Sequence, residues 1–417
     1  MTRIGQALRR LKSKLFYLRW KCRAYRTASV AAKLYDVGKT YWIDPERISR
    51  SVDSPSIDRR VASPPVNPLL ERGRIVGGDW DLQCGPFEEM QSWQAFQDRF
   101  VHHRSWQETS WYSRILRDIR PNMALWGCTT QEELDARFRM IDRLFDEIKH
   151  NGYRAQSEIR DGACRPYGDE DEIYVHIGRN GDYIFANGRH RLCIARILKL
   201  DRVPVKVAKR HVHWANFRKE ILACAKKTAS GKAYAPLPHP DLADIPSHHG
   251  HERMEMMAKR ISASRGALLD LGANWGYFCH RFADLGFQCT AVEVDRVHLY
   301  FMRKLMRAEN KSFEIIDRSI LDLETARKFD VVLALNIFHH FLKKQDLHEG
   351  LIRFLSRLEA GTMFFEPHLP GEPQMAGSFR NYGPEEFAEF IKEHGRFGRS
   401  EQIGTALDGR PLFMLRR

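Results

Sequence analysis

The chain has 417 residues, which is long for one domain, so two domains that each bury a core are expected. Its formal net charge is +14, and about +10 of this comes from residues 1–40, which hold eleven Lys or Arg against one acid, Asp36. Because the remainder is close to neutral, the charge does not require a nucleic-acid groove spread across the protein.

Membrane-spanning and secretory signals are missing from the pattern. No run of eighteen apolar residues occurs, and the amino terminus lacks the apolar core and cleavage site of a secretory signal. The eight cysteines contain no Cys-x-x-Cys pair. This usage favours reduced thiols in a cytoplasm over a zinc site or a disulfide framework.

Residues 1–40 predict a basic amphipathic helical arm. Apolar residues recur at helical spacing, and basic residues surround them. The apolar positions are Ile4, Leu8, Leu11, Leu15 and Leu18. Three interpretations stay open: packing on the protein with a solvated basic face, peripheral binding to an anionic membrane surface, or contact with RNA phosphates.

Residues 41–227 are predicted to form the first globular domain. Its apolar periodicity predicts helices over Phe87–Val101, Trp106–Asp118 and Thr130–Lys149. The last of these has an N-cap pattern, because Glu133 follows Thr130 by three residues.

The stretch from Glu172 to Val207 predicts a hairpin, a helix and a returning strand. Arg-Asn-Gly between alternating apolar runs is a hairpin signal, and the helix begins near Gly188. The residues at this helix start are Gly188, Arg189, His190 and Arg191. Cationic side chains beside free backbone N–H groups suit a phosphate, and the alternative is an ordinary charged helix start packed against acidic neighbours.

This stretch resembles the ParB and sulfiredoxin superfamily, whose members carry a Gly-x-x-Arg turn before a helix and bind nucleotide phosphates there. The resemblance covers about forty residues, from Glu172 to His211. It implies an α+β domain that binds a nucleotide, ATP or CTP, at the helix start. Sulfiredoxins have cysteine where Arg189 stands, which argues against their chemistry. Asp79 and Asp81 are either a base or metal ligand for such a site, or acids of a surface loop.

Residues 228–250 are rich in Pro, Gly and Ser and predict an interdomain linker. Four histidines in or next to this segment are dense enough to suggest a metal: His239, His248, His249 and His251. No Cys or carboxylate spacing supports a ligand set. A solvated linker is therefore the preferred interpretation, and no metal site is predicted.

Residues 251–417 are predicted to form the second domain. Ala267–Leu271 has the composition of a buried parallel strand, and Gly272–Gly276 that of a tight turn that leads into a helix. Glycines in such a turn let the backbone approach a cofactor. Asp270, near the carboxyl end of the strand, would face the crevice where open α/β sheets bind ligands.

Two later strands also end in polar residues. One, Gln288–Asp295, places Glu293 within reach of a ribose diol, and the other, Phe329–Asn336, is followed by Ile-Phe-His-His-Phe. This series resembles class I S-adenosylmethionine-dependent methyltransferases. The resemblance implies an α/β fold with a Rossmann-like seven-stranded sheet, a closing antiparallel hairpin, and S-adenosylmethionine as cofactor.

The resemblance also implies which residues hold the cofactor. They are Asp270, Gly272, Ala273, Asn274, Gly276, Glu293, Asp317 and Asn336. The adenine contact is assigned to Asp317, although the position expected for that acid falls nearest Ser319.

His339 and His340 follow the strand that carries Asn336. Either could act as general base toward an oxygen or nitrogen nucleophile, or both could be packing residues on the cofactor side. Methyl transfer itself depends mainly on in-line placement of the nucleophile at the sulfonium methyl group. The loop Leu369–Tyr382 is expected to cover the acceptor pocket.

The leading hypothesis is methyl transfer to a small-molecule acceptor, or to a glycan- or lipid-linked one, by a cytoplasmic protein with a nucleotide-binding ParB-like domain. Residues 1–40 could hold it at the inner membrane face. One alternative is an RNA methyltransferase whose arm, with Arg189 and Arg191, contacts phosphates. A second alternative is a non-catalytic, nucleotide-sensing scaffold.

Overall fold

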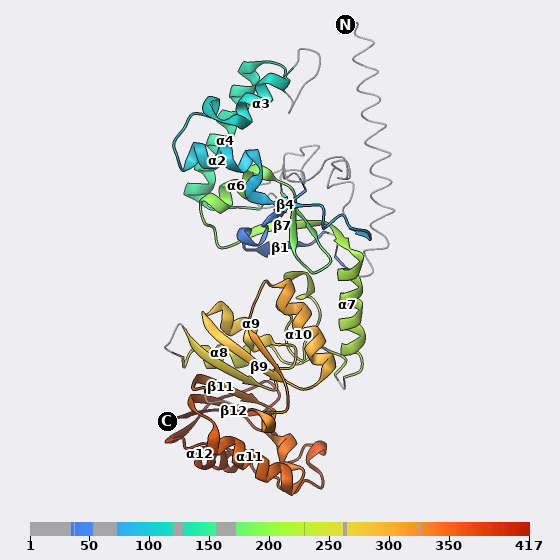
Figure 1. The fold of residues 1–417 in the computed structure, drawn as a ribbon, viewed down its shortest axis with the longest axis vertical. Coiled ribbons are helices and arrows are strands. Elements are labelled where there is room, and N and C mark those ends of the chain that lie inside the picture. Colours follow the sequence, from blue (N-terminus) through green and yellow to red (C-terminus); the bar gives the residue numbers. More distant parts are fainter. Residues whose placement is uncertain are drawn as a thin grey trace. The chain divides into compact units, whose positions relative to one another are not determined.

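The computed structural model describes residues 35–36, 38–52, 73–119, 128–155, 172–228, 230–261, 265–324 and 327–417. The chain divides into two compact units, Met1–Arg218 and Lys219–Arg417, here called the N-terminal and C-terminal units (Figure 1). The division falls inside α7 (Val212–Ala225), so the last turns of this helix belong to the C-terminal unit. Nearly all of the arm expected over residues 1–40 lies outside the described residues.

The N-terminal unit contains a mixed seven-stranded sheet in the order β1-β7-β5-β6-β2-β4, with β3 paired to β7. Its strands are β1 (Thr40–Ile43), β2 (Arg50–Ser51), β3 (Arg74–Val76), β4 (Gly85–Pro86), β5 (Ile173–Ile177), β6 (Tyr183–Asn187) and β7 (Val203–His211). The predicted hairpin is confirmed, because β5 and β6 pair antiparallel across the turn. The strand that follows the helix, β7, then pairs parallel to β5.

Helices of the N-terminal unit pack around an aromatic core. They are α2 (Gln91–Phe100), α3 (Ser110–Asp118), α4 (Gln131–Asn151) and α6 (Arg189–Ile197), with 3₁₀ turns at Pro45–Arg47, Phe87–Glu89 and Trp106–Glu108. Trp106 lies 4.7 Å from Phe138 and 5.4 Å from Phe96 between ring centroids. The predicted N-cap is confirmed: Thr130 Oγ1 accepts the Glu133 N–H at 3.3 Å. The Glu133 carboxylate turns back to Thr129, one residue earlier than a capping box requires.

The C-terminal unit is built on a second seven-stranded sheet in the order β10-β9-β8-β11-β12-β14-β13. Its strands are β8 (Gly266–Leu271), β9 (Phe287–Glu293), β10 (Glu314–Asp317), β11 (Phe329–Leu335), β12 (Ala360–Glu366), β13 (Arg399–Thr405) and β14 (Pro411–Arg416). The first five are parallel, and β14 pairs antiparallel with both β12 and β13. The predicted sheet and its closing hairpin are therefore confirmed.

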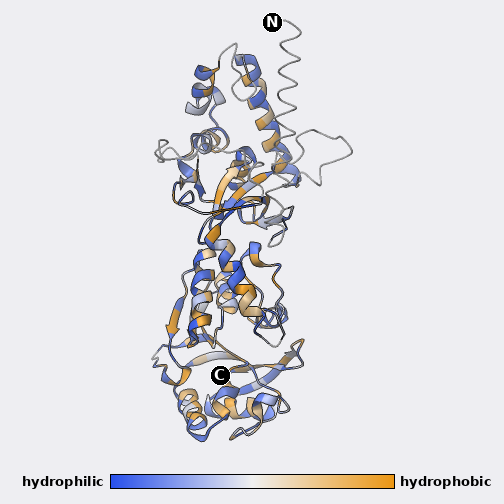
Figure 2. Ribbon diagram, turned by 90° about the vertical axis from the view of Figure 1, so that its right-hand side faces the viewer, coloured by the Kyte–Doolittle hydropathy of each residue, from blue (hydrophilic) through white to orange (hydrophobic). Residues whose placement is uncertain are grey.

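Helices pack on the second sheet. They are α8 (Glu252–Ala258), α9 (Tyr277–Asp284), α10 (Arg296–Ala308), α11 (Gln345–Arg357) and α12 (Pro384–His394), with 3₁₀ turns at Pro240–Leu242, Ile320–Asp322, Phe338–Leu342 and Pro373–Met375. Buried apolar residues of α8, α9 and α10 form one core cluster with the sheet, and those of α11 and α12 form another. Helix ribbons carry both hydrophilic and hydrophobic residues, as expected of helices that bury one face (Figure 2). None of the helices traced in the described ranges is long and apolar enough to cross a bilayer.

Residues 230–250 differ from the solvated linker that their composition suggests. Leu237, Leu242 and Ile245 are buried, and so is His239, which caps the 3₁₀ turn that follows it. A β-bridge joins Ala233 to Ser247 and closes the segment into a loop. Pro and Gly here mark turns rather than a free spacer, because the apolar residues between them find a surface to cover.

Candidate cofactor and acceptor site

The carboxyl ends of β8, β9 and β11 meet where the strand order of the second sheet reverses. β8 lies between β9 and β11, and the chain passes from β8 to β9 on one side and reaches β11 on the other. Open α/β sheets bind ligands in the crevice outside the strand ends at such a switch point. The sheet therefore places the residues that follow these three strands around one crevice.

The turn after β8 needs glycine at two positions. Gly272 has φ +73°, and a Cβ there would lie 2.6 Å from Ile337 Cδ1. Gly276 has φ +82° and caps α9, and a Cβ there would lie 3.0 Å from Met302 Cγ. Asn274 also has a positive φ, of 52°. Residues with a Cβ rarely adopt this backbone, so the glycines permit the tight turn and keep its surface open.

Glu293, the last residue of β9, presents a carboxylate at this turn. Its Oε2 accepts the Asn274 N–H at 2.9 Å, and its Oε1 accepts the N–H groups of Val294 and Asp295 at 2.8 and 2.9 Å. Burial by itself raises the pKa of Glu293, but hydrogen bonds from His298 and the backbone outweigh it, so the pKa is lowered. The group is an anionic acceptor suited to a ribose diol.

Asp270 lies one residue before the end of β8 and is 3% exposed. Burial raises its pKa to about 7, and the neighbouring Glu293 charge acts in the same direction, while the Cys279 thiol and Arg253 oppose it. A carboxyl group held in this way is ready to ionise when a cation arrives.

A cavity of about 620 Å³ opens at these strand ends. Its walls include Gly272, Asn274, Glu293, Asn336 and His339. Asn336 has φ 52°, and its buried Oδ1 has no hydrogen-bond partner among the described residues. Ligand pockets typically measure about 300–1,000 Å³, so this cavity has the size of a small-molecule site.

A smaller cavity of about 20 Å³ adjoins it and shares Gly272 and Asn274. Asp270 and Ala273 line this smaller cavity. Seven of the residues implied as cofactor ligands thus lie in one region, six on the cavity walls and Gly276 in the turn itself.

Asp317 is the exception among the implied cofactor residues. It lies outside both cavities, is exposed, and its Oδ2 pairs with Arg303 Nη2 at 3.5 Å. The wall at this point is formed by Ser319, with Arg318 and Ile320 beside it. The physical reason is that β10 is the edge strand of the sheet, so Asp317 at its end lies on the solvent side and pairs with Arg303 of α10. Ser319, which is nearest to the position expected for that acid, therefore lies on the cavity wall, whereas Asp317 does not.

Several wall residues come from segments other than the three strand ends. Tyr234 lines both cavities, and Cys224 and Ala225 at the end of α7 line the larger one. Arg253 of α8 lines the smaller cavity, where its Nη1 donates to Glu366 Oε2 at 2.9 Å and both side chains are buried. Tyr234, Cys224 and Ala225 carry no local motif, because they reach the site only through tertiary packing.

His339 and His340 both line the larger cavity but differ in burial. His339 is 3% exposed, whereas His340 is exposed. Neither ring nitrogen of His339 has a hydrogen-bond partner among the described residues. Burial lowers the pKa of His339 to about 3, so its imidazole is neutral near pH 7. Of the two candidates for a base, His339 is the one held inside the cavity wall.

The second predicted site, Gly188–Arg191 at the start of α6, lies in the N-terminal unit. Gly188 has φ +85°, and a Cβ there would lie 2.6 Å from the Glu172 carbonyl oxygen. His190 stacks on Phe96 with ring centroids 6.0 Å apart, and burial lowers its pKa to about 3. The Arg191 guanidinium lies over the Tyr153 ring at 5.6 Å. His190 therefore packs inward, and the arginines are the cations of this helix start.

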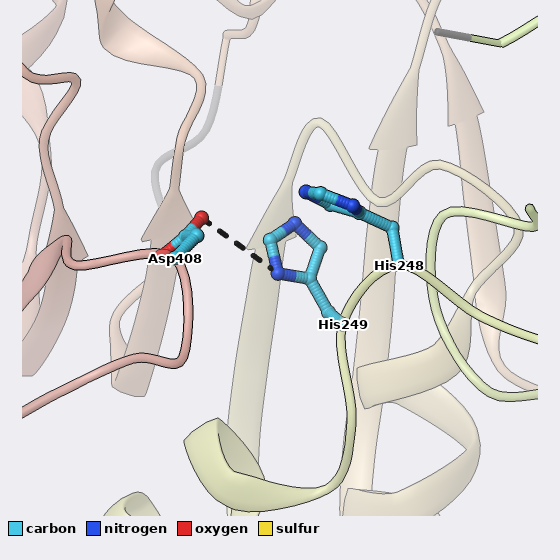
Figure 3. A group of neighbouring side chains, drawn as sticks. All are labelled: His248, His249 and Asp408. Atoms are coloured by element: carbon cyan, nitrogen blue, oxygen red, sulfur yellow. Dashed lines mark ion pairs between the residues drawn. The ribbon is translucent and has the colours of Figure 1, made fainter. Parts of the chain in front are cut away.

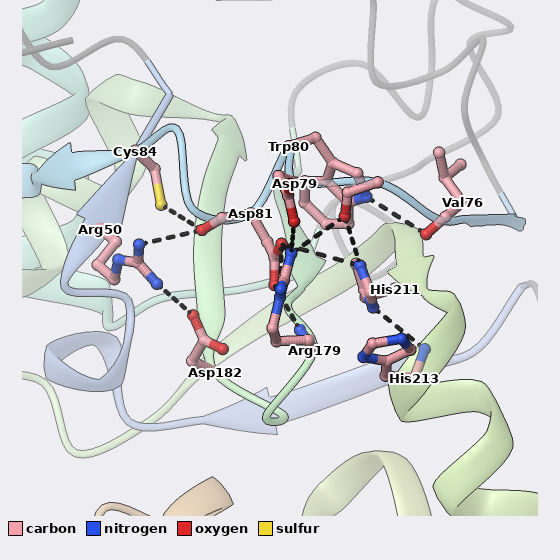
Figure 4. Close-up of polar contacts among 11 residues, drawn as sticks. Arg50, Val76, Asp79, Trp80, Asp81, Cys84, Arg179, Asp182, His211 and His213 are labelled. Carbon is pink, nitrogen blue, oxygen red and sulfur yellow. Dashed lines mark hydrogen bonds and ion pairs between the residues drawn. The ribbon is translucent and has the colours of Figure 1, made fainter.

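Asp79 and Asp81, considered above as a base or metal ligand, both form ion pairs with Arg179 (Figure 4). Arg179 Nη2 lies 2.7 Å from Asp79 Oδ1 and 2.8 Å from Asp81 Oδ1. Asp81 is buried and also accepts the Arg179 backbone N–H at 2.8 Å. This pairing fastens the β5–β6 turn, since Arg179 lies within it.

Comparison with known proteins identifies the C-terminal unit. Residues 269–364, from β8 to β12, match the family described as "Methyltransferase domain". A search of curated proteins found no match. The C-terminal unit therefore contains a methyltransferase domain, as predicted, and such a domain implies S-adenosylmethionine as cofactor.

Solved structures with similarity to the chain include two enzymes described as methyltransferases. The bifunctional kinase-methyltransferase WbdD is 19% identical, with a TM-score of 0.39 over 47% of this chain and 46% of that chain. The N-methyltransferase NodS from Bradyrhizobium japonicum WM9 is 16% identical, with a TM-score of 0.32 over 40% of this chain and 95% of that chain. The match thus spans a little under half the length of WbdD.

Proposed function

We propose that the C-terminal unit binds S-adenosylmethionine across the ends of β8, β9 and β11 and transfers its methyl group to an oxygen or nitrogen nucleophile. The observation that carries this proposal is one cavity that joins the Gly272 turn, the anionic Glu293 carboxylate and the free Asn336 Oδ1. Glu293 accepts the ribose hydroxyls. The methionine end would lie beside the smaller cavity, where its positive charge would favour the Asp270 carboxylate.

The bound cofactor supplies an electrophilic methyl group, so the chain's task is placement. The acceptor atom must lie in line with the methyl carbon and the sulfur, and held geometry of this kind lowers the barrier by about 7–11 kcal/mol in well-oriented systems. The Gly272 turn and Asn336 fix one side of the crevice. The remaining wall, with His339 and His340, faces the acceptor.

His339 is the residue we assign to the acceptor proton. Its unpartnered ring nitrogens and neutral form allow it to accept a hydrogen bond from a hydroxyl or amine that enters the cavity. The lowered pKa makes it a weak base. It would therefore orient the nucleophile more than deprotonate it, and loss of the imidazole should reduce turnover without loss of cofactor affinity.

A small-molecule acceptor, or the exposed end of a glycan- or lipid-linked one, fits this cavity better than an RNA chain. Tyr234, Phe341 and Gln374 contribute to its walls, so the acceptor atom must reach a recessed position. Small-molecule sites are concave and mostly apolar with a few convergent polar groups, and the walls have this composition.

Calorimetry with S-adenosylmethionine tests the cofactor site. The wild type should bind one equivalent, and Asp270→Ala should abolish the binding heat. Mass spectrometry of a cell extract incubated with the protein and methyl-labelled cofactor then reports the acceptor. A wild type that binds no cofactor would exclude an enzymatic role and leave the non-catalytic scaffold.

For the N-terminal unit, we propose that the start of α6 binds a phosphate of a nucleotide such as ATP or CTP. The support is the left-handed Gly188 cap, which offers no side-chain hydrogen bond to the first N–H groups of α6, next to Arg189 and Arg191. Titration with each nucleotide should give binding that Arg189→Ala weakens. Equal affinity in the variant would refute this assignment.

We further propose that the protein is cytoplasmic and that residues 1–40 hold it at an anionic membrane face. The support is the basic amphipathic pattern of the sequence. Flotation with phosphatidylserine-containing liposomes should require residues 1–40. RNA affinity that falls steeply as salt rises would instead favour the RNA alternative.

A further inference from the structure

A cluster of metal-ligand side chains lies where residues 230–250 meet the β13–β14 turn. His248 and His249 precede α8, and Asp408 lies far along the chain between β13 and β14 (Figure 3). One ligand atom from each residue can be chosen so that all three lie within 4.8 Å of one another. Within the described ranges, this is the group of His, Cys, Asp and Glu that meets such a spacing.

His249 is the fixed member of this cluster. It is 2% exposed, and its Nδ1 lies 3.9 Å from Asp408 Oδ2. Its Nε2 has no hydrogen-bond partner among the described residues. A buried imidazole without a full set of partners is costly, so a ligand at this position would relieve an existing penalty.

His248 is the adjustable member. It is exposed, and its ring lies edge to face with that of His249, with centroids 4.6 Å apart. Rotation of an exposed side chain costs little. His248 can therefore move the distance needed to bring a ring nitrogen to the same point as His249 and Asp408.

Asp408 is oriented by Arg410. Arg410 Nη1 donates to Asp408 Oδ2 at 2.9 Å, and the Arg410 backbone N–H donates to Oδ1 at 3.2 Å. Arg410 also donates through Nε to Glu372 Oε1 at 2.9 Å. A carboxylate has about four lone-pair sites, so these bonds leave positions for a metal. Ligating carboxylates are usually held by such outer hydrogen bonds.

We propose that His248, His249 and Asp408 bind a divalent transition metal, with Zn²⁺ the best fit. Two imidazole nitrogens with one carboxylate oxygen suit Zn²⁺, whereas Mg²⁺ and Ca²⁺ prefer oxygen ligands throughout. Zinc bonds of about 2.0–2.2 Å require the three ligand atoms to draw together from their present spacing. The exposed His248 and the turn that carries Asp408 supply that movement.

Such an ion would cross-link residues 230–250 to the closing β13–β14 hairpin, because its ligands come from both segments. The His249 ring lies 4.7 Å from that of Tyr234, centroid to centroid, and Tyr234 lines both cavities. The ion would thus steady one wall of the crevice without touching it. Binding of the ion itself does not depend on the function proposed above.

The test is a Zn²⁺ titration of the metal-free full chain by calorimetry, with Mg²⁺ as the comparison ion. We expect one Zn²⁺ per chain and no Mg²⁺ binding. His248→Ala and Asp408→Asn should each weaken Zn²⁺ binding by more than about 10–100-fold, because removal of a ligand costs more than removal of its supporting partner. The matched control is His150→Ala, which removes an exposed histidine of α4 and should leave the titration unchanged.

Two further readouts separate lost binding from lost folding. Co²⁺ should give the visible absorption of a four-coordinate site with the wild type and lose it with His248→Ala, which replaces an exposed side chain. Zn²⁺ should raise the thermal midpoint of the wild type and of His150→Ala but not of His248→Ala. No saturable Zn²⁺ binding, or wild-type binding by both ligand variants, would overturn the proposal.

Discussion

At the scale of single residues, the buried Asp270 carboxyl group makes the stability of the folded protein depend on pH. Its carboxyl group is buried, and its pKa is raised from 3.8 to about 7. The folded chain therefore holds this proton more tightly than the unfolded chain. The resulting stabilisation is full below about pH 4 and is lost as the pH rises from about 4 to about 7.

We expect Asp270→Asn to remove this pH dependence from the cofactor-free protein. Each pKa unit corresponds to about 1.4 kcal/mol, so the stability gained by the variant over the wild type should grow by about 2–3 kcal/mol between pH 5 and pH 8. Urea unfolding at both pH values measures it. Parallel curves for the two proteins would show that Asp270 keeps an ordinary pKa.

Glu293 is the second residue whose charge can be tested directly. Glu293→Gln keeps the shape but removes the anion, and hydrogen bonds to charged groups contribute about 1.5–3 kcal/mol. We therefore expect S-adenosylmethionine to bind about 10–100-fold more weakly in calorimetry. Glu359→Gln, which changes an exposed acid of the same unit, should bind like the wild type. Unchanged affinity in Glu293→Gln would remove the ribose assignment.

At the scale of elements, the turn between β8 and α9 combines backbone strain with close approach. A Cβ at position 272 would clash with Ile337. An alanine there would also have to adopt the left-handed backbone that Gly272 has. We expect Gly272→Ala to destabilise the protein by about 1–2 kcal/mol and to weaken cofactor binding at least about tenfold. Thermal melts and calorimetry measure the two effects.

Gly371→Ala is the matched control for this turn. A Cβ at Gly371 meets nothing within 4 Å, and its backbone is not left-handed. It should therefore be neutral or slightly stabilising in both measurements. If the two alanine variants behave alike, the turn has no special role.

Much of this turn was predictable from the sequence because its signal is local. Glycines at 272 and 276, a strand before them and an acid ending the next strand are features of short segments. The wall formed by Tyr234 and Cys224 was not predictable, since it depends on packing between distant segments. The grouping of Asp408 with His248 and His249 was not predictable for the same reason, since Asp408 lies in the distant β13–β14 turn.

The ion pair between α8 and β12 gives a further prediction for elements. Arg253 and Glu366 are both buried and 2.9 Å apart, and removal of one partner leaves an uncompensated charge. We expect Arg253→Met to cost about 3–5 kcal/mol of unfolding free energy. Arg253→Met combined with Glu366→Gln should recover part of this loss in urea unfolding. A double variant less stable than the single one would contradict the pairing.

At the scale of the whole molecule, two compact units share one helix. The division inside α7 leaves Cys224 and Ala225 with the cofactor crevice, while the start of the helix belongs to the N-terminal unit. Composition alone placed the boundary after residue 227, because the Pro- and Gly-rich segment begins there. In the structure the boundary lies earlier, after Arg218, and residues 230–250 cover apolar surface of the C-terminal unit.

Two units with separate cores should unfold in two calorimetric transitions, and each ligand should act on the unit that holds its site. At a free concentration about 100 times its Kd, S-adenosylmethionine should stabilise its unit by about 2.7 kcal/mol. It should therefore raise one transition and leave the other in place. ATP or CTP should raise the second transition if the start of α6 binds phosphate, and Arg189→Ala should cancel that shift alone. A nucleotide that moves the same transition as S-adenosylmethionine would place both ligands in the C-terminal unit and remove the nucleotide site from α6.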